Sequence, residues 1–177
     1  MAPLWVFGYG SLIWNPGFAV AERRLARLTG WRRSFCMWSI HHRGTVDQPG
    51  LVLALDADPE GLCHGVAFRA EPGTEEATLA LLRDRELISS AYVETCLPVT
   101  FADGGGCEAV VYVIDTDHVQ YCHLPQDEQA RIIAHAVGGR GANRDYLWST
   151  VEHLDALGIP DTDLSLLAEK VRRLARA

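Results

Sequence analysis

The 177-residue sequence predicts an α+β fold built around an antiparallel sheet. β-prone runs dominate residues 5–115, two of the connections between them carry hairpin turn signals, and helical patterns fill residues 125–175. Hairpins pair strands antiparallel, whereas a Rossmann sheet or a TIM barrel would alternate strands with helices. The length, with no internal repeat or long linker, predicts one domain over residues 1–177.

Apolar and β-branched runs define the predicted strands. They cover residues 5–8, 24–39, 51–56, 62–69, 92–101 and 108–115. The second run surrounds Gly30 and can form one strand or two. Asp-Pro-Glu-Gly at residues 58–61 and Asp-Gly-Gly-Gly at residues 103–106 predict the two hairpin turns.

Capping residues and helical spacing define the predicted helices. They cover residues 75–86, 125–137, about 143–158 and about 161–175. Thr74 is expected to cap the first helix, Asn143 the third, and either Asp161 or Asp163 the fourth. Glycines follow the second and third helices, as is usual where a helix ends.

Composition and charge exclude several function classes. A net charge of −7 argues against a nucleic-acid binder, and the paired arginines, such as Arg32-Arg33, are expected on a solvated surface. A secretion signal and a run of about 18 apolar residues are both missing, so no membrane span is expected. Five scattered cysteines without a C-x-x-C pair are typical of reduced thiols in the cytoplasm.

The common cofactor and metal motifs fail on inspection. Gly8-Tyr9-Gly10 begins like a dinucleotide fingerprint, but Ile13 stands where its third glycine belongs. Lys170, the lone lysine, lies in no phosphate loop. The histidines and cysteines lack metal-ligand spacing. We therefore expect no cofactor and no metal ion.

Two features remain as candidates for chemistry. The glycines of residues 8–12 (GYGSL) let consecutive N–H groups converge on a carboxylate, with a tight turn as the alternative. Glu86 lies four residues after Leu82 and seven after Leu79, so its carboxylate projects from an apolar stripe. That position is costly unless the carboxylate is paired or its pKa is raised. A salt bridge with an arginine, or an exposed last turn, is the alternative.

Residues 5–14 (WVFGYGSLIW) resemble the opening signature of the ChaC-like, glutathione-specific γ-glutamylcyclotransferases. Further matches follow in family order at residues 42–44 (HRG), 49–50 (PG), 63–69 (CHGVAFR), 85–86 (RE) and 143–147 (NRDYL). The resemblance extends from residue 5 to about residue 174.

This resemblance implies a small β-barrel-like sheet wrapped by helices. It also implies a cofactor-independent lyase in the cytoplasm that releases 5-oxoproline and cysteinyl-glycine from glutathione, with Glu86 as general base and acid. A small-molecule substrate is implied, with no nucleic acid and no membrane as partner. The implied substrate-binding residues are Val6, Phe7, Gly8, Tyr9, Gly10, Ser11, Leu12, Tyr92 and Tyr146.

The expected chemistry needs only one acid. The substrate's own α-amine attacks the γ-carbonyl and closes a five-membered ring, so the enzyme holds the chain curled and moves protons. Backbone N–H groups of residues 10–12 can bind the α-carboxylate or steady the oxyanion, and the sequence leaves both open.

Residues 87–91 (LISSA) depart from the animal members, which follow the glutamate with a lysine and a glycine pair. The segment is one residue longer before Tyr92 and looks more like the bacterial branch. Strict selectivity for glutathione is therefore open. The alternatives are the same chemistry on another γ-glutamyl amine or peptide, and a non-catalytic regulator linked to cation transport.

Overall fold

The computed structural model describes residues 2–87 and 90–176. Ile88 and Ser89, in the segment that departs from the family pattern, lie outside the described residues. The chain forms two compact units, which are described separately: Met1–Arg33 with Ala54–His118, and Ser34–Leu53 with Val119–Ala177. The single domain over residues 1–177 stays a prediction.

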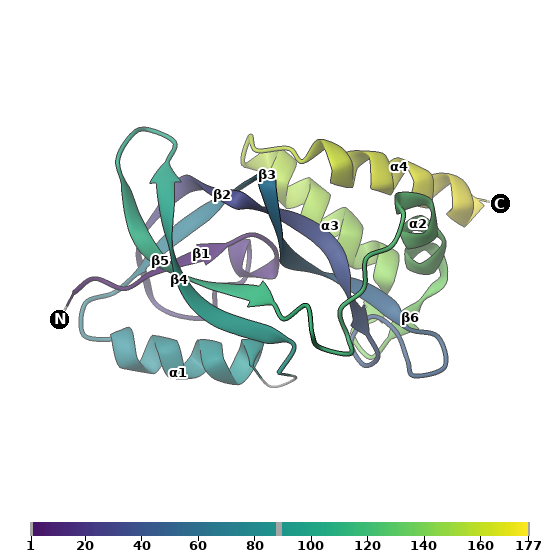
Figure 1. Cartoon of the computed structure of the whole chain (residues 1–177), viewed down its shortest axis with the longest axis horizontal. Coiled ribbons are helices and arrows are strands. Elements are labelled where there is room, and N and C mark those ends of the chain that lie inside the picture. Colours follow the sequence, from purple (N-terminus) through teal and green to yellow (C-terminus); the bar gives the residue numbers. More distant parts are fainter. Residues whose placement is uncertain (1, 88–89, 177) are drawn as a thin grey trace. The chain divides into compact units, whose positions relative to one another are not determined.

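Five strands close into a barrel in the order β1-β3-β2-β4-β5 (Figure 1). They are β1 (Trp5–Gly8), β2 (Val20–Ser39), β3 (Gly50–Ala70), β4 (Tyr92–Phe101) and β5 (Gly106–Ile114). β1 pairs antiparallel with β3 and parallel with β5, while β4 pairs antiparallel with β2 and β5. The predicted α+β class and the mostly antiparallel, barrel-like sheet are confirmed. Closure leaves each strand with a neighbour on both sides for part of its length.

One of the two predicted hairpins is wrong. β4 and β5 form the expected hairpin around residues 102–105, but β3 runs straight through residues 58–61. Arg32 of β2 lies 3.8 Å from the carboxylate of Asp58, so this segment is extended alongside β2. Pro59 is tolerated because β1 pairs with β3 only further on, from Val66, and needs no N–H from this proline.

The helix of the first unit, α1 (Glu75–Glu86), has the predicted bounds and packs on the barrel (Figure 1). Its fully buried Leu82 belongs to a core cluster with residues of β1, β5 and the turn after β1, namely Val6, Leu12, Val110 and Tyr112. Thr74 occupies the N-cap position as predicted, but its hydroxyl makes no capping bond and instead donates to the Glu71 carbonyl at 2.6 Å.

The second unit contains the remaining helices and a short hairpin. They are α2 (Gln126–His135), β6 (Val137–Gly138), β7 (Gly141–Ala142), α3 (Asn143–Ala156) and α4 (Thr162–Arg176). The three helices pack against one another. Asp161 caps α4, as expected, because its Oδ1 accepts from the N–H of Leu164 at 3.1 Å.

The second predicted helix begins one residue too early and ends two residues too late. The chain leaves α2 after His135 and turns back through β6 and β7. Gly139 N–H donates to the His41 carbonyl at 2.7 Å, and Arg140 N–H to the His42 carbonyl at 2.9 Å. These bonds satisfy backbone groups that a longer helix would have used internally.

Asn143 does not cap α3, and this prediction is also wrong. Its side chain is fully buried and pairs with the backbone of Leu51 in β3. Leu51 N–H donates to Oδ1 at 2.8 Å, and Nδ2 donates to the Leu51 carbonyl at 2.8 Å. The side-chain amide of Asn143 therefore bonds both backbone groups of Leu51, as a residue of a neighbouring strand would.

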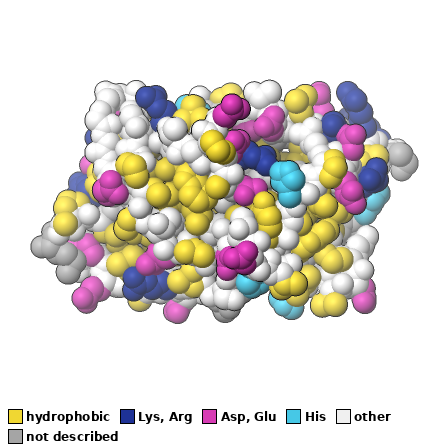
Figure 2. Space-filling view, in the orientation of Figure 1, with side chains coloured by type: hydrophobic (Ala, Val, Ile, Leu, Met, Phe, Trp, Pro, Cys, Tyr) yellow, Lys and Arg dark blue, Asp and Glu magenta, His cyan; other side chains and the backbone are white. Residues whose placement is uncertain are grey.

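Charge is mixed on the face drawn in Figure 2, where acidic and basic side chains lie among apolar ones. Within the described ranges, no helix is long and apolar enough to cross a membrane.

Candidate active site

The chain leaves β1 through a tight turn that contains a short 3-10 helix, η1 (Ser11–Ile13). Ile13 N–H donates to the Gly10 carbonyl and Asn15 N–H to the Ser11 carbonyl, both at 2.9 Å. The N–H groups of Ser11 and Leu12 come before Ile13, the first donor of this turn. At the start of any helix, such N–H groups have no acceptor within the helix itself. The tight turn is therefore observed, while ligand binding by its amides stays a prediction.

The turn is held from β2 and β3. Arg33 is only 7% exposed, and its Nε donates to the Tyr9 carbonyl at 2.8 Å while its Nη2 donates to the His64 carbonyl. The expectation that this arginine lies on a solvated surface is wrong. Gly65 lets β3 approach, because a Cβ there would lie 2.3 Å from the Gly8 carbonyl oxygen.

The predicted binding residues of β1 and the turn differ in what they can offer a ligand. Val6 and Phe7 are 0% exposed, so neither their side chains nor their backbone groups present surface to a ligand. Tyr9 and Leu12 are also buried, and Ser11 is half-buried. A ligand at this turn would therefore contact mainly backbone and the Ser11 hydroxyl.

Glu86 is the last residue of α1, and its side chain is 16% exposed. Burial raises the pKa of this carboxyl, and the neighbouring Arg85 lowers it in part. The Arg85 Nε lies 3.5 Å from Glu86 Oε1. Both outcomes considered for this position, a raised pKa and an ion pair with an arginine, thus occur together.

Arg85 connects this carboxylate to the turn after β1. Its Nη2 donates to the Ser11 Oγ at 3.1 Å, and its Nη1 donates to the Asn15 carbonyl at 2.6 Å. The proposed acid and the proposed binding loop therefore lie on the same unit and share one guanidinium. Sequence reasoning did not identify this residue's role, because its partners are 70 and 74 residues away.

A second polar group lies beside the apolar stripe of α1. The buried Tyr112 of β5 donates its hydroxyl to Glu94 Oε1 at 2.7 Å, and Arg83 binds both oxygens of Glu94 at 3.0 Å. Burial and this hydrogen bond raise the pKa of Tyr112, and the charge of Glu86 also raises it. The Arg83 guanidinium holds the pKa of Glu94 below its usual range.

The two predicted pocket tyrosines belong to different units. Tyr92, at the start of β4, is half-buried and packs against the core cluster that contains Leu12 and Leu82. Tyr146, on α3 in the second unit, accepts a hydrogen bond from Leu53 N–H at 3.4 Å and packs edge-on against Phe35. A substrate-binding role for either tyrosine stays a prediction.

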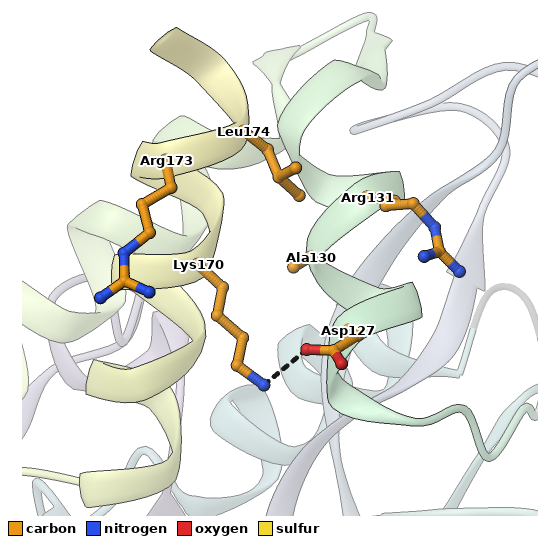
Figure 3. A pocket seen from close by; sticks show the side chains of 6 residues that line it. All are labelled: Asp127, Ala130, Arg131, Lys170, Arg173 and Leu174. Carbon is orange, nitrogen blue, oxygen red and sulfur yellow. Dashed lines mark hydrogen bonds and ion pairs between the residues drawn. The ribbon is translucent and has the colours of Figure 1, made fainter. Parts of the chain in front are cut away.

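A surface cavity of about 300 Å³ lies between α2 and α4 (Figure 3). Its lining consists of Asp127, Ala130, Arg131, Lys170, Arg173 and Leu174. Lys170 pairs with Asp127 at 2.6 Å, and the guanidinium groups of Arg131 and Arg173 point away from the gap. The lining contains none of the predicted site residues, so we assign it no role in the chemistry.

Metal ligands do not gather in the part of the chain that the structure describes. Within residues 2–87 and 90–176, no group of three or more His, Cys, Asp or Glu side chains is placed to hold a metal ion. The site as described therefore consists of a carboxylate, a guanidinium and a backbone turn.

Comparison with known proteins identifies relatives along nearly the whole chain. The glutathione-specific gamma-glutamylcyclotransferase of Escherichia coli (strain K12) is 38% identical over 176 residues, which cover 97% of this chain and 74% of that protein. Gamma-glutamylcyclotransferase 2-3 of Arabidopsis thaliana is 34% identical, covering 97% of this chain and 89% of that protein. The human glutathione-specific gamma-glutamylcyclotransferase 1 is 32% identical, covering 93% and 76%.

A crystal structure of a γ-glutamyl cyclotransferase specific to glutathione from yeast has the same fold. It superposes with a TM-score of 0.88 over 98% of this chain and 97% of that chain, at 24% identity. At this identity the likeness concerns the fold. The family model described as ChaC-like protein matches residues 4–174. The chain therefore belongs to the ChaC-like family.

Proposed function

We propose that the chain is a cofactor-independent γ-glutamylcyclotransferase that acts on glutathione and releases 5-oxoproline and cysteinyl-glycine. The observation that carries this proposal is the largely buried carboxylate of Glu86, with its raised pKa, joined through Arg85 to the turn after β1. The E. coli and human relatives named as glutathione-specific support the substrate.

The proposed reaction forms one C–N bond and breaks another. The α-amine of the γ-glutamyl group attacks the γ-carbonyl carbon to close a five-membered ring, and the bond from that carbon to the cysteine nitrogen breaks. The protons lost by the attacking nitrogen balance those gained by the leaving nitrogen, so no co-reactant is consumed. Holding the substrate curled supplies much of the acceleration, because it fixes the two reacting atoms in a near-attack geometry.

Glu86 is the proposed carrier of the proton between the two nitrogens. As a carboxylate it accepts a proton from the attacking amine, and as a carboxylic acid it returns one to the leaving nitrogen. Burial raises the pKa of Glu86 toward neutrality, which improves it in both roles at neutral pH. The amides of Ser11 and Leu12 are proposed to bind the α-carboxylate or the oxyanion, and both assignments stay open.

The remaining expectations form part of the same proposal. Residues 6–12, chiefly through backbone groups and the Ser11 hydroxyl, and the side chain of Tyr92 would contact the γ-glutamyl group. A substrate-binding role is also proposed for Tyr146, from the family resemblance. A small molecule is the proposed partner, with neither nucleic acid nor membrane, and the proposed location is the cytoplasm.

The Glu86→Gln variant tests the proposal. We expect it to fold and to bind glutathione with little change in KM, but to lose at least about 10²-fold in kcat, the usual scale of general acid–base catalysis. Formation of 5-oxoproline from reduced glutathione, followed by mass spectrometry, measures the rate. Glu76→Gln, the same change at an exposed position on the same helix, is the matched control and should retain full activity.

Two outcomes would contradict the proposal in different ways. Near-normal turnover of Glu86→Gln would remove Glu86 from the mechanism. Faster turnover of another γ-glutamyl amine or peptide than of glutathione would keep the chemistry and change the substrate. Absence of 5-oxoproline from any γ-glutamyl compound would favour a non-catalytic regulator.

A further inference from the structure

We infer that Arg85 is a positioning residue for the proposed reaction, because its guanidinium holds the turn after β1 against the end of α1 and fixes the Glu86 carboxylate beside that turn. The inference rests on the proposed function of Glu86. It goes further by assigning a task to a second side chain.

The geometry of the contacts carries the inference. One guanidinium contacts Glu86 Oε1 from Nε at 3.5 Å, the Ser11 Oγ from Nη2 at 3.1 Å and the Asn15 carbonyl from Nη1 at 2.6 Å. The guanidinium is planar and presents its five donors in a rigid fork. Two hydrogen-bond acceptors and one ion-paired carboxylate, contacted by three different nitrogens, are therefore held in a fixed spatial relation to one another.

The two arginines in the last turn of α1 have separate tasks. Arg83 is 53% exposed and binds Glu94, which attaches the helix to β4. Arg85 is 26% exposed and binds the turn after β1. Because it is less exposed, solvent screens the Arg85 charge less, so its effect on Glu86 is larger than that of a surface ion pair.

Arg85 is also the cation that acts on Glu86. Among the described residues, the charged and titratable groups linked to Glu86 are Arg85 on its own helix, Tyr112 from β5, and Glu94 from β4, which is hydrogen-bonded to Tyr112. Glu94 is paired with Arg83, and burial keeps Tyr112 protonated. Without Arg85, the effect of burial on Glu86 would be unopposed and its pKa would rise further.

Arg85→Met and Arg85→Lys separate the two contributions of this residue. Methionine removes both the charge and the fork, so we expect kcat to fall about 10- to 100-fold through misplacement of the reacting groups. We also expect the acid limb of the kcat–pH profile to move to higher pH. Lysine keeps the charge without the fork. Its acid limb should stay near that of the wild type, while kcat is restored only in part.

Arg83→Met is the matched control. It removes the same charge from the same helix two residues away but leaves the contacts of Arg85 in place. We expect its acid limb to coincide with that of the wild type. Circular dichroism and thermal unfolding establish that each variant is folded before its kinetics are compared.

Several results would overturn the inference. They are an Arg85→Met variant with wild-type kcat and pH profile, an Arg85→Lys variant with both fully restored, and an equal displacement of the acid limb in Arg83→Met. If Arg85→Met does not fold, Arg85→Lys alone decides the matter by its kcat. An inactive Glu86→Gln beside a wild-type-like Arg85→Met refutes this inference only, whereas an active Glu86→Gln refutes the proposed function itself.

Discussion

Replacing Asn143 by alanine should destabilise the second unit strongly. The side chain of Asn143 is 0% exposed and makes two hydrogen bonds of 2.8 Å to the backbone of Leu51, which is also 0% exposed. Alanine leaves both the N–H and the carbonyl of Leu51 without these partners. Each buried unsatisfied group costs about 1–3 kcal/mol, so the two together lower the free energy of unfolding by about 2–6 kcal/mol.

Urea unfolding followed by circular dichroism measures this loss as a lower midpoint with an unchanged slope. Glu152→Ala, at an exposed position on the same helix, is the control and should stay within about 0.5 kcal/mol of the wild type. Asn143→Asp keeps an acceptor for Leu51 N–H but loses the donor and buries a charge, so it should cost at least as much as alanine. A loss below about 1 kcal/mol for Asn143→Ala would refute the assignment of both bonds as buried and necessary.

Two further predictions concern α1. Leu82→Ala should lower the free energy of unfolding by about 2–5 kcal/mol, because the side chain is fully buried in the core cluster. Leu82→Met, which nearly conserves the volume, should lower it by less than about 1.5 kcal/mol. Equal losses for the two variants in urea unfolding would contradict this prediction. Burial raises the folded-state pKa of Glu86 above its ordinary 4.5, so the stability that the protonated carboxyl contributes is present below that value and is lost as pH rises through the folded-state pKa. In thermal unfolding, the stability advantage of Glu86→Gln over the wild type should therefore grow from about pH 4 to pH 8. Its increase should be about 1.4 kcal/mol for each unit by which the pKa of Glu86 is raised. A difference in stability that stays constant with pH would contradict this prediction.

The elements that sequence predicted well are those with local signals. α1 and β4 have the expected bounds, since helical spacing with early carboxylates and a glycine-rich turn are read within a few residues. The same local reasoning failed at residues 58–61, where Asp-Pro-Glu-Gly favours a turn. Pairing with β2 and the ion pair between Arg32 and Asp58 keep that segment extended. Tertiary contacts of this kind are invisible to local propensity.

The residues of the candidate site likewise differ in whether local sequence signals reveal them. Glu86 could be selected from the sequence as a candidate because its distance from Leu82 places a carboxylate on an apolar stripe, while its proton-transfer role came from the family resemblance. The partners of Arg33 and Asn143 lie 24 and 92 residues away, so nothing in the local sequence separates them from a surface arginine and a helix cap. The binding role of the turn and tyrosines came from family resemblance and remains to be tested.

The surroundings of α1 shift the pKa values of two of its carboxyl groups in opposite directions, and this difference supports the proposed role of Glu86 in proton transfer. Backbone N–H donation from Gly73 holds the pKa of Glu75 below its usual range at the exposed start of α1. At the other end, burial raises the pKa of Glu86 while Arg85 limits the rise. Burial alone would raise the pKa of the carboxyl further, whereas pairing with Arg85 alone would lower it and weaken the carboxylate as a base. The proposed proton carrier depends on both influences, so activity should fall on removing either the carboxylate or the guanidinium, whereas stability should rise only on removing the carboxylate.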